Sequence, residues 1–304
     1  MLVKKDLDKM SDGQLFETVA LIKGYDVKPT KTGGKFIGGC LEIKGSVDFK
    51  VWAGSLLDDM EKYDYSDTIC KISGKVNEYN GLKSLVLNDI KALDEGTYDQ
   101  SDFFEDKYDV EAYWNGLVNL IKKNSSLESF EIFSEVMSYE GLSKRFKVEF
   151  AARGHHDAVK TGLLAHTYKV TYIMSRVLKL YPTICSTLDT DVLVLGSALH
   201  DIGKVYEYTN GVIKDNGLLV SHHTFGVEIL SKYKEFIISK KSEEFYYRLL
   251  AIIEQHHGEF EETPRTIEAM IVHLVDNIES RMQIINETYE RGLGVVSLGE
   301  YKLN

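Results

Sequence analysis

The 304-residue sequence predicts a two-domain protein, with a small all-β barrel first and an all-α domain after it. Two observations indicate this division. Segments that alternate apolar and charged residues, separated by turn signals, occupy the part before residue 95. Apolar residues recur at helical spacing from Tyr113 onward, and all nine histidines lie between His155 and His273. The two parts therefore differ in both periodicity and chemistry.

Residues 1–95 carry the pattern of paired β-strands. Residues 41–51 alternate apolar and charged side chains around a Gly-Ser pair, as in a hairpin with one buried face. Residues 69–93 repeat the pattern around an Asn-Gly pair, which is a strong signal for a tight hairpin turn. Residues 15–23 add a further strand. About five strands in roughly 80 residues favour a barrel of the OB type.

A locally basic stretch lies within this barrel-forming part. Residues 25–39 are expected to form a loop rich in Lys, Thr and Gly, and six lysines occur between residues 23 and 50. Together with Phe36, Phe49 and Trp52, these lysines form a candidate stacking platform for single-stranded nucleic acid. In the alternative, Phe49 and Trp52 belong to the barrel core and the lysines form a solvated face.

Composition and charge narrow the class of protein. Hydrophobic residues make up 43% of the chain and charged residues 27%, which is ordinary for a globular protein. The net charge of −11 argues against a protein that coats nucleic acid through bulk charge. No run of about 18 apolar residues occurs and the first residues include acids, so we expect a cytoplasmic protein without a membrane span. Cys40, Cys70 and Cys185 are expected to be free thiols.

Residues 96–150 are expected to connect the two domains. Residues 94–111 hold eight acidic residues against one lysine, and a helix is expected to begin near Val110. Apolar residues at helical spacing over 113–121 and 127–137 indicate two helices. We expect these helices to serve packing alone.

The motif S-A-L-H-D-I-G-K places His200 and Asp201 side by side at the end of the apolar segment 192–199. A neutral imidazole and a carboxylate presented together suit a divalent metal ion. Lys204 follows one helical turn later and could place a positive charge beside whatever the metal binds. Taken alone, the motif also fits a helix that ends in a polar pair with Gly203 as its C-cap.

The remaining histidines favour the metal-binding alternative. Ionisable groups spread over apolar helices are costly unless they converge and are paired or bound to metal, so we expect them to converge. The groups concerned are His166 in residues 158–178, His222 and His223 before residues 224–233, His256 and His257 after residues 249–254, and Asp276 in residues 264–290.

The last of these segments is expected to form one long helix that Thr266 could cap. It has an apolar stripe, as amphipathic helices do. The stripe consists of Ile267, Met270, Ile271, Leu274, Ile278, Met282 and Ile285.

The number of candidate ligands favours two metal ions. Two cations about 3.5 to 4 Å apart clamp the attacking and leaving oxygens of a phosphate displacement. A shell of His and Asp without thiolate suits Mn²⁺ or Fe²⁺, with Zn²⁺ or Ni²⁺ as alternatives. The expected ligands of the first ion are His166, His200, Asp201 and Asp276, and Asp201 is expected to bridge to a second ion held by His222, His256 and His257.

The order of these motifs resembles the HD superfamily of metal-dependent phosphohydrolases, which has an all-helical fold. Four segments are also similar to the YhaM family of bacterial 3′-5′ exoribonucleases, which join an OB-fold to an HD domain. These segments are F-A-A-R-G-H-H-D (150–157), G-L-L-A-H-T (162–167), L-H-D-I-G-K (199–204) and P-R-T-I-E-A (264–269).

This resemblance implies Mn²⁺-dependent trimming of single-stranded RNA, or single-stranded DNA, from 3′ ends to nucleoside 5′-monophosphates. We accordingly expect an OB-fold-like nucleic-acid-binding domain over residues 1–95, connecting helices over 96–150 and an HD domain over 151–304. Asp201 and Lys204 are the expected catalytic residues. Assembly into a homo-oligomer is left open.

Three residues ahead of the ligand set are candidates for holding substrate. We expect Arg153, His155 and His156 to line the entrance of the site and hold the terminal phosphates, although a polar turn before a helix is the alternative. The neighbouring His222 and His223 leave open which imidazole is the ligand, and the preceding Gly-Leu-Leu favours His222.

Two other functions are compatible with the same sequence. The HD domain could hydrolyse a nucleotide or a cyclic nucleotide, with the OB-like part used for oligomerisation. Alternatively, the chain could be a binding module whose metal site is structural. Lys204 and the second group of histidines argue against a binding module, because a structural site needs neither.

Overall fold

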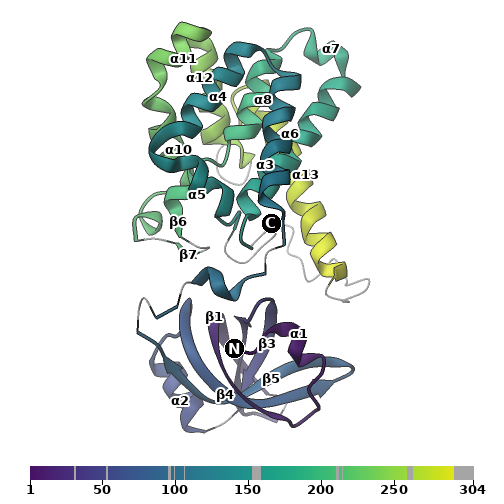
Figure 1. Ribbon diagram of the computed structural model, residues 1–304, viewed down its shortest axis with the longest axis vertical. Helices are drawn as coiled ribbons and strands as arrows, with labels where there is room; N and C mark the ends of the chain where they lie inside the picture. The colour runs from purple at the N-terminus through teal and green to yellow at the C-terminus, as the bar shows by residue number, and fades with distance from the viewer. Residues whose placement is uncertain are drawn as a thin grey trace. The chain divides into compact units, whose positions relative to one another are not determined.

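The computed structural model consists of two compact units, each described by itself (Figure 1). Unit 1 spans Met1–Glu105 and unit 2 spans Asp106–Asn304. The predicted fold class, a β-barrel followed by a helical domain, is confirmed. The structure describes residues 1–304 with the exception of 31, 53, 95–96, 99, 106, 153–158, 210–211, 214, 259–262 and 291–304.

Unit 1 is a closed barrel with the strand order β1-β2-β3-β5-β4. Strands β3 and β5 are parallel, and β1 pairs antiparallel with both β2 and β4, which closes the sheet. This order, with helix α2 between β3 and β4, is that of an OB barrel. The elements are α1 (Lys4–Leu7), β1 (Leu15–Pro29), β2 (Lys35–Glu42), β3 (Ser46–Val51), α2 (Ser55–Lys62), β4 (Thr68–Tyr79), β5 (Leu82–Ala92) and the short 3-10 helix η1 (Gln100–Phe103).

Both predicted hairpins are present. The loop predicted over residues 25–39, between the first strand and the first hairpin, is wrong. Strand β1 continues to Pro29 and β2 begins at Lys35, so most of residues 25–39 is paired. Glycine-rich composition normally indicates a loop. Here it permits close pairing, because a Cβ on Gly39 would lie 2.5 Å from the carbonyl oxygen of Gly24.

The barrel interior is apolar and separates the aromatic residues of the candidate platform. Phe49 is 1% exposed and belongs to the core, whereas Trp52 is 47% exposed. Cys70 is a buried free thiol, and burial raises its pKa to about 12. Cys40 is likewise a reduced thiol, while the side chain of Cys185 lies outside the described part of the chain.

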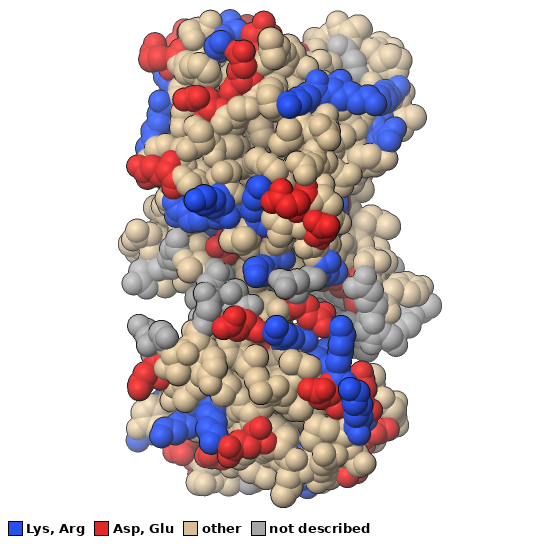
Figure 2. All heavy atoms as spheres, in the orientation of Figure 1, with Lys and Arg blue, Asp and Glu red and all other residues tan. Residues whose placement is uncertain are grey.

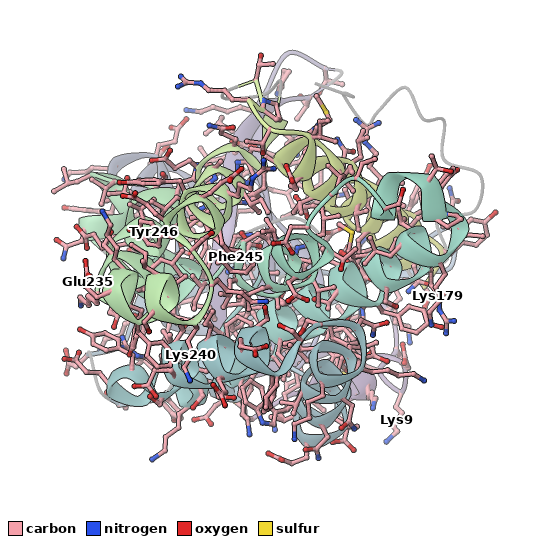
Figure 3. The ribbon with its side chains drawn as sticks, turned by 90° about the horizontal axis from the view of Figure 1, so that it is seen from above. Lys9, Lys179, Glu235, Lys240, Phe245 and Tyr246 are labelled. Atoms are coloured by element: carbon pink, nitrogen blue, oxygen red, sulfur yellow. The ribbon has the colours of Figure 1, made fainter. Side chains whose placement is uncertain are left out.

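Unit 2 is helical apart from a short ribbon of β6 (Tyr208–Thr209) and β7 (Val212–Ile213). The longer helices pack around one hydrophobic core. Seen from above, Phe245 lies inside the helical unit, whereas Lys179 and Glu235 lie at its edge (Figure 3). The helices are α3 (Val110–Asn124), α4 (Leu127–Ser138), η2 (Tyr139–Gly141), α5 (Leu142–Val148), α6 (Gly162–Leu180), α7 (Pro182–Cys185), α8 (Thr190–Leu199), α9 (Lys204–Glu207), η3 (Asp215–Leu218), α10 (His222–Ser231), α11 (Lys234–Lys240), α12 (Glu243–Gln255) and α13 (Ile267–Glu290).

The helices predicted in the connecting segment form part of this core. Helix α3 begins at Val110, as predicted, because the Asp109 carboxylate accepts a hydrogen bond from the Ala112 amide at 2.9 Å. Leu117 and Ile121 of α3 are fully buried in the same cluster as the residues of α8. Helix α8 is buried along its length, which carries the motif that follows it into the interior.

The apolar stripe predicted on α13 does not mark the buried face of that helix. Ile271 is half-buried, and the other stripe residues are exposed within the described structure, Ile267 by 64%. The inward face instead carries Val272 and Val275 together with polar groups, including the buried Glu279. The reason is that the inward face must supply polar groups to the site, so apolar periodicity alone cannot identify it.

No helix in the described ranges is both long and apolar enough to cross a membrane. On the face drawn in Figure 2, Lys and Arg side chains form small groups interspersed with Asp and Glu.

Thr266 caps α13 as predicted, since its Oγ1 accepts a hydrogen bond from the Ala269 amide at 3.1 Å.

Candidate metal centre

Two groups of potential metal ligands meet inside unit 2, and each draws on several helices. The first contains His166 of α6 with His200 and Asp201, which directly follow α8. The second contains His222 and His223 at the start of α10, together with His256 and His257 after α12. Within each group the ligand atoms lie within 4.8 Å of one another. The convergence expected from the sequence is therefore present in the structure.

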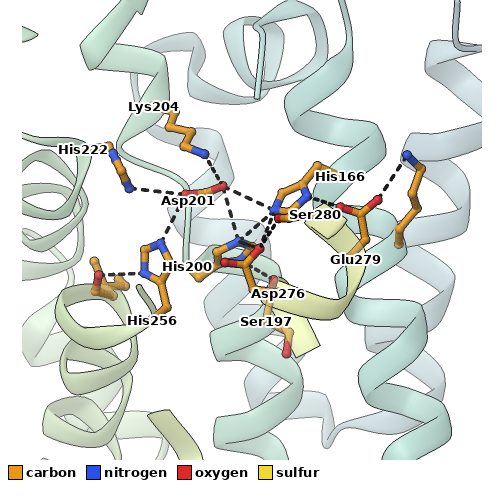
Figure 4. Close-up of polar contacts among 12 residues, drawn as sticks. His166, Ser197, His200, Asp201, Lys204, His222, His256, Asp276, Glu279 and Ser280 are labelled. Atoms are coloured by element: carbon orange, nitrogen blue, oxygen red, sulfur yellow. Dashed lines mark hydrogen bonds and ion pairs between the residues drawn. The ribbon is translucent and has the colours of Figure 1, made fainter. Parts of the chain in front are cut away.

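The first group gathers around the Nε2 atoms of two histidines (Figure 4). His166 Nε2 lies 3.2 Å from His200 Nε2 and 3.1 Å from Asp276 Oδ1. Asp201 Oδ2 is 3.5 Å from His166 Nε2 and 3.4 Å from His200 Nε2. Two imidazole nitrogens and two carboxylate oxygens thus face a common point.

The second group contains four imidazole rings in close contact. The ring centroids of His222 and His223 are 4.3 Å apart, and those of His256 and His257 are 4.5 Å apart. Across the group, the His223 and His257 centroids are 4.5 Å apart. The sequence left open whether His222 or His223 is the ligand. The structure brings both imidazoles to the site.

Asp201 lies between the two groups and turns one oxygen to each. Its Oδ2 faces the first group, as given above. Its Oδ1 lies 3.5 Å from His222 Nε2 and 3.4 Å from His256 Nε2 (Figure 4). A single carboxylate is therefore placed so that it could bind one ion through each oxygen.

The site histidines turn their Nε2 atoms inward because their Nδ1 atoms have partners on the outer side. His200 Nδ1 lies 2.9 Å from the Ser197 carbonyl oxygen, and His256 Nδ1 lies 3.0 Å from the Ile253 carbonyl oxygen. A carbonyl oxygen only accepts hydrogen bonds, so each Nδ1 carries the proton and donates it. The Nε2 lone pair of each ring is then available to a metal ion.

The donor set fits divalent metal ions. Asp201 Oδ1, His222 Nε2 and His256 Nε2 are buried and have no hydrogen-bond partner among the described residues. Buried polar atoms of this kind are costly unless something binds them. Imidazole nitrogen and carboxylate oxygen without thiolate suit Mn²⁺, Fe²⁺, Ni²⁺ or Zn²⁺.

Charges at the centre shift the titration of its groups. Burial would raise the pKa of Asp201, but Lys204 and His200 hold it well below its usual range. Burial would lower the pKa of His166, but hydrogen bonds to Asp276 and Glu279 raise it to about 10. The first group therefore holds a strongly ionised carboxylate beside a protonated imidazole, and this imidazole would have to release its proton in order to bind a metal ion.

Lys204 and Gly203 fix the geometry beside Asp201. Lys204 Nζ lies 2.7 Å from Asp201 Oδ2, and its side chain is 12% exposed, so the predicted placement on the same side as the pair is confirmed. Gly203 precedes α9 and does not end a helix in the left-handed conformation, so the C-cap alternative is wrong. A Cβ on Gly203 would lie 1.9 Å from the His222 carbonyl oxygen, which shows how closely α10 approaches.

Some predicted residues fall elsewhere, and others were missed. Arg153, His155 and His156 lie outside the described residues. Phe36 and Trp52 lie in unit 1, with ring centroids 5.1 Å apart. The structure adds three groups at the site that the sequence did not single out. These are Glu279 beside His166, Glu207 beside His222, and His273, whose Nδ1 lies 2.9 Å from the His256 carbonyl oxygen. It also places His223, which the sequence offered only as an alternative to His222, in the second group beside it.

The helical unit and the whole chain both have similar known proteins. Residues 163–281 match the family model described as HD domain. The chain is 28% identical over 308 residues to the 3′-5′ exoribonuclease YhaM of Bacillus subtilis, with 95% of this chain and 91% of that protein covered. It is also 28% identical over 310 residues to the 3′-5′ exoribonuclease YhaM of Bacillus velezensis, with the same coverage.

Among solved structures, two of the mitochondrial single-stranded DNA-binding protein Rim1 from S. cerevisiae align with 14% identity. They cover 29% of this chain and all of the other, with TM-scores of 0.25 and 0.26. The assignment of the barrel therefore rests on its own strand order. Residues 163–281 are thus similar to HD domains, and nearly the whole chain is similar to two proteins named 3′-5′ exoribonuclease YhaM.

Proposed function

We propose that this protein is a metal-dependent 3′-5′ exoribonuclease that hydrolyses single-stranded RNA or single-stranded DNA to nucleoside 5′-monophosphates. The observation that carries the proposal is the position of Asp201, with one oxygen toward each of two histidine groups. Similarity to two proteins named 3′-5′ exoribonuclease supports the same reaction.

The proposed ligands of the two ions follow from the two groups. His166, His200 and Asp276 would hold the first ion with Asp201 Oδ2, and His222, His256 and His257 would hold the second with Asp201 Oδ1. The donor set suits Mn²⁺, and two such ions would supply Lewis acidity and activate water for attack on the scissile phosphate.

Lys204 would act on the phosphate itself. Burial lowers the pKa of its ammonium group, but the neighbouring Asp201 raises it above the usual value, so the group stays charged. A fixed cation beside the metal centre stabilises the negative charge that develops on the phosphate oxygens during displacement. We assign Lys204 this role rather than that of a ligand, because an ammonium group has no lone pair.

The barrel would hold the strand. Trp52 is exposed, packs against Phe36 and has Lys50 Nζ 6.0 Å from its ring. Exposed aromatic rings beside cations bind single strands by base stacking and by contacts with the backbone. In the helical unit, Arg153, His155 and His156 would hold the terminal phosphates at the entrance of the site.

The test is an incubation of 5′-labelled single-stranded RNA with the protein and Mn²⁺. A descending ladder with release of nucleoside 5′-monophosphates is expected, and Asp201→Asn should abolish both. An enzyme that leaves the RNA intact but hydrolyses free nucleotides or cyclic nucleotides would contradict the exonuclease proposal and support the alternative HD-domain activity.

A further inference from the structure

One imidazole in each group of the metal centre is supported by a buried carboxylate. Glu279 Oε2 lies 2.6 Å from His166 Nδ1, and Glu207 Oε2 lies 2.8 Å from His222 Nδ1. As described above, the corresponding nitrogens of two other ligands donate to backbone carbonyls. Each ion would therefore face one histidine supported by a carboxylate and one supported by a peptide group.

Spacing along the helices ties both carboxylates to the site. Glu279 follows Asp276 by three residues on α13, so one face of this helix supplies both a ligand and the support for another ligand. Glu207 follows Lys204 by three residues on α9 and stands in the same relation to it. Both acids therefore follow a residue of the site at helical spacing.

Both carboxylates are also held from a second side. The other oxygen of Glu279 lies 3.2 Å from Lys169 Nζ, and Lys169 in turn donates to Gln283 Oε1 at 2.9 Å. Glu207 accepts a further hydrogen bond from the backbone of His222. Because Glu279 and Glu207 are buried, these contacts fix their orientation toward the rings.

The chemistry of the pair favours metal binding. A ring that donates its Nδ1 hydrogen to a carboxylate keeps the tautomer in which Nε2 is the ligand, and the negative charge makes that nitrogen a stronger donor to a cation. A peptide carbonyl fixes the same tautomer but adds no charge. Removing such a carboxylate typically costs about 10- to 100-fold in metal affinity.

We propose that Glu279 and Glu207 are positioning residues, the first for the ion held by His166 and the second for the ion held by His222. This inference rests on the proposed two-metal function and adds that the two positions are supported independently. Loss of either carboxylate weakens the binding of one ion and leaves the binding of the other unchanged.

A purely structural role makes a different prediction. A buried acid that only pairs with a base would lower the stability of the fold when replaced, without a selective effect on one ion. Glu268 provides the matched control, because it lies on the same helix α13, is equally buried and pairs with Arg248 of α12.

The experiment is a Mn²⁺ titration of the full-length chain by equilibrium dialysis, with EPR to distinguish coupled ion pairs from isolated ions. The variants are Glu279→Gln, Glu207→Gln and Glu268→Gln, each also made as Ala. Glutamine keeps the size and the hydrogen bond but removes the charge. Thermal unfolding of each metal-free variant separates loss of metal from loss of fold.

We expect wild type and Glu268→Gln to bind two ions alike. The affinity for one ion should fall about 10- to 100-fold in Glu279→Ala and in Glu207→Ala, and by a smaller factor in the Gln variants, which keep the hydrogen bond. The His256→Ala background, which we expect to empty chiefly the second position, assigns the effect. In that background, Glu279→Gln should weaken the binding of the remaining ion, and Glu207→Gln should leave its binding unchanged.

Two results would overturn the inference. One is wild-type affinity for both ions in both Gln variants, and the other is equal weakening by Glu279→Gln and Glu207→Gln in the His256→Ala background. If an Ala variant does not fold, the Gln variants decide. A wild-type chain that binds fewer than two Mn²⁺ ions contradicts the two-metal function itself, which is a separate failure that also removes the basis for this inference.

Discussion

Lys204 Nζ lies 2.7 Å from Asp201 Oδ2, the carboxylate oxygen that faces the first group of ligands. This contact places a buried cation at the centre without using it as a ligand. It also helps to hold the Asp201 carboxylate in its ionised form, since the ammonium group lowers the pKa of Asp201.

We therefore predict that Lys204→Ala keeps both metal ions and loses rate. A preorganised donor to developing charge is worth about 10²- to 10³-fold in kcat, so a decrease of that size is expected on single-stranded RNA. Elemental analysis and steady-state kinetics on the same preparation measure the two quantities. Wild-type turnover, or loss of metal with the rate, would contradict the assigned role.

Replacement of Asp201 should affect both ions at once. Asp201→Ala removes one oxygen from each group, so we expect metal content to fall by more than one equivalent and activity to be lost. Asp191→Asn is a suitable control, because Asp191 is also a buried acid, lies at the other end of α8 and pairs with Lys241. Full metal occupancy in Asp201→Ala would remove this residue from the bridging position.

Replacement of Gly203 should affect metal binding more selectively than replacement of Asp201. Gly203→Ala would place a Cβ 1.9 Å from the His222 carbonyl oxygen and 2.6 Å from the Gly226 amide nitrogen, so α10 must move. We expect Gly203→Ala to lower the melting temperature and to empty chiefly the second position. Metal binding followed by EPR, with thermal unfolding, tests this. Two ions bound with wild-type affinity would show that the close approach does not control the site.

The titration of His166 predicts that metal binding releases a proton. In the metal-free protein its pKa is raised to about 10, so the ring is protonated at pH 8, whereas a ligand imidazole must be neutral. Affinity for the first ion should therefore rise with pH up to about 10. By linkage, the stability that this ring contributes to the metal-free fold is present below its ordinary pKa of about 6.5 and is lost as pH rises through about 10.

Calorimetric titration with Mn²⁺ at pH 8, in two buffers of different ionisation enthalpy, counts the released protons. We expect about one proton to be assigned to His166 and to be missing in His166→Ala. Equal proton release by the two proteins would contradict this assignment.

The barrel should affect how the strand is held. One stacked base is worth about 1 to 3 kcal/mol, so Trp52→Ala should weaken binding of a roughly 20-nucleotide RNA by about 5- to 150-fold. Hydrolysis of a dinucleotide should change far less. Tyr79→Ala is the control, because Tyr79 is another exposed aromatic residue of the barrel, at the β4–β5 turn. Equal losses on the long and short substrates would argue against a strand-binding role for Trp52.

The sequence predicted the groups whose spacing reflects their chemistry. The sequence could identify candidate ligands because a buried imidazole or carboxylate in an apolar helix is rare and costly. These candidates include His166, His200, Asp201 and Asp276. Glu279 could not be identified in this way. It is one of 47 acidic residues in the chain, and only the packing of α13 against α6 shows that it meets a histidine.

Other features that the sequence did not predict correctly have similar physical causes. Alternation in residues 47–51 places Phe49 on the buried face, but Trp52 follows the alternating segment, so the pattern could not show which side of the closed sheet it occupies. The length of β1 was hidden by glycines that are suited to close strand pairing. On α13, the outward position of the apolar stripe was hidden by the polar groups that the site requires on the inner face.

In the proposed reaction, two ions bridged by Asp201 act together on single-stranded RNA. The most direct measurement is the initial rate on 5′-labelled RNA plotted against the number of Mn²⁺ ions bound per chain, with Asp201→Asn as the inactive reference. We expect the rate to follow the fraction of chains that hold two ions, so that the rate stays low at low occupancy and rises steeply as occupancy approaches two ions per chain. A rate that increases linearly and reaches its maximum at one bound ion would contradict it.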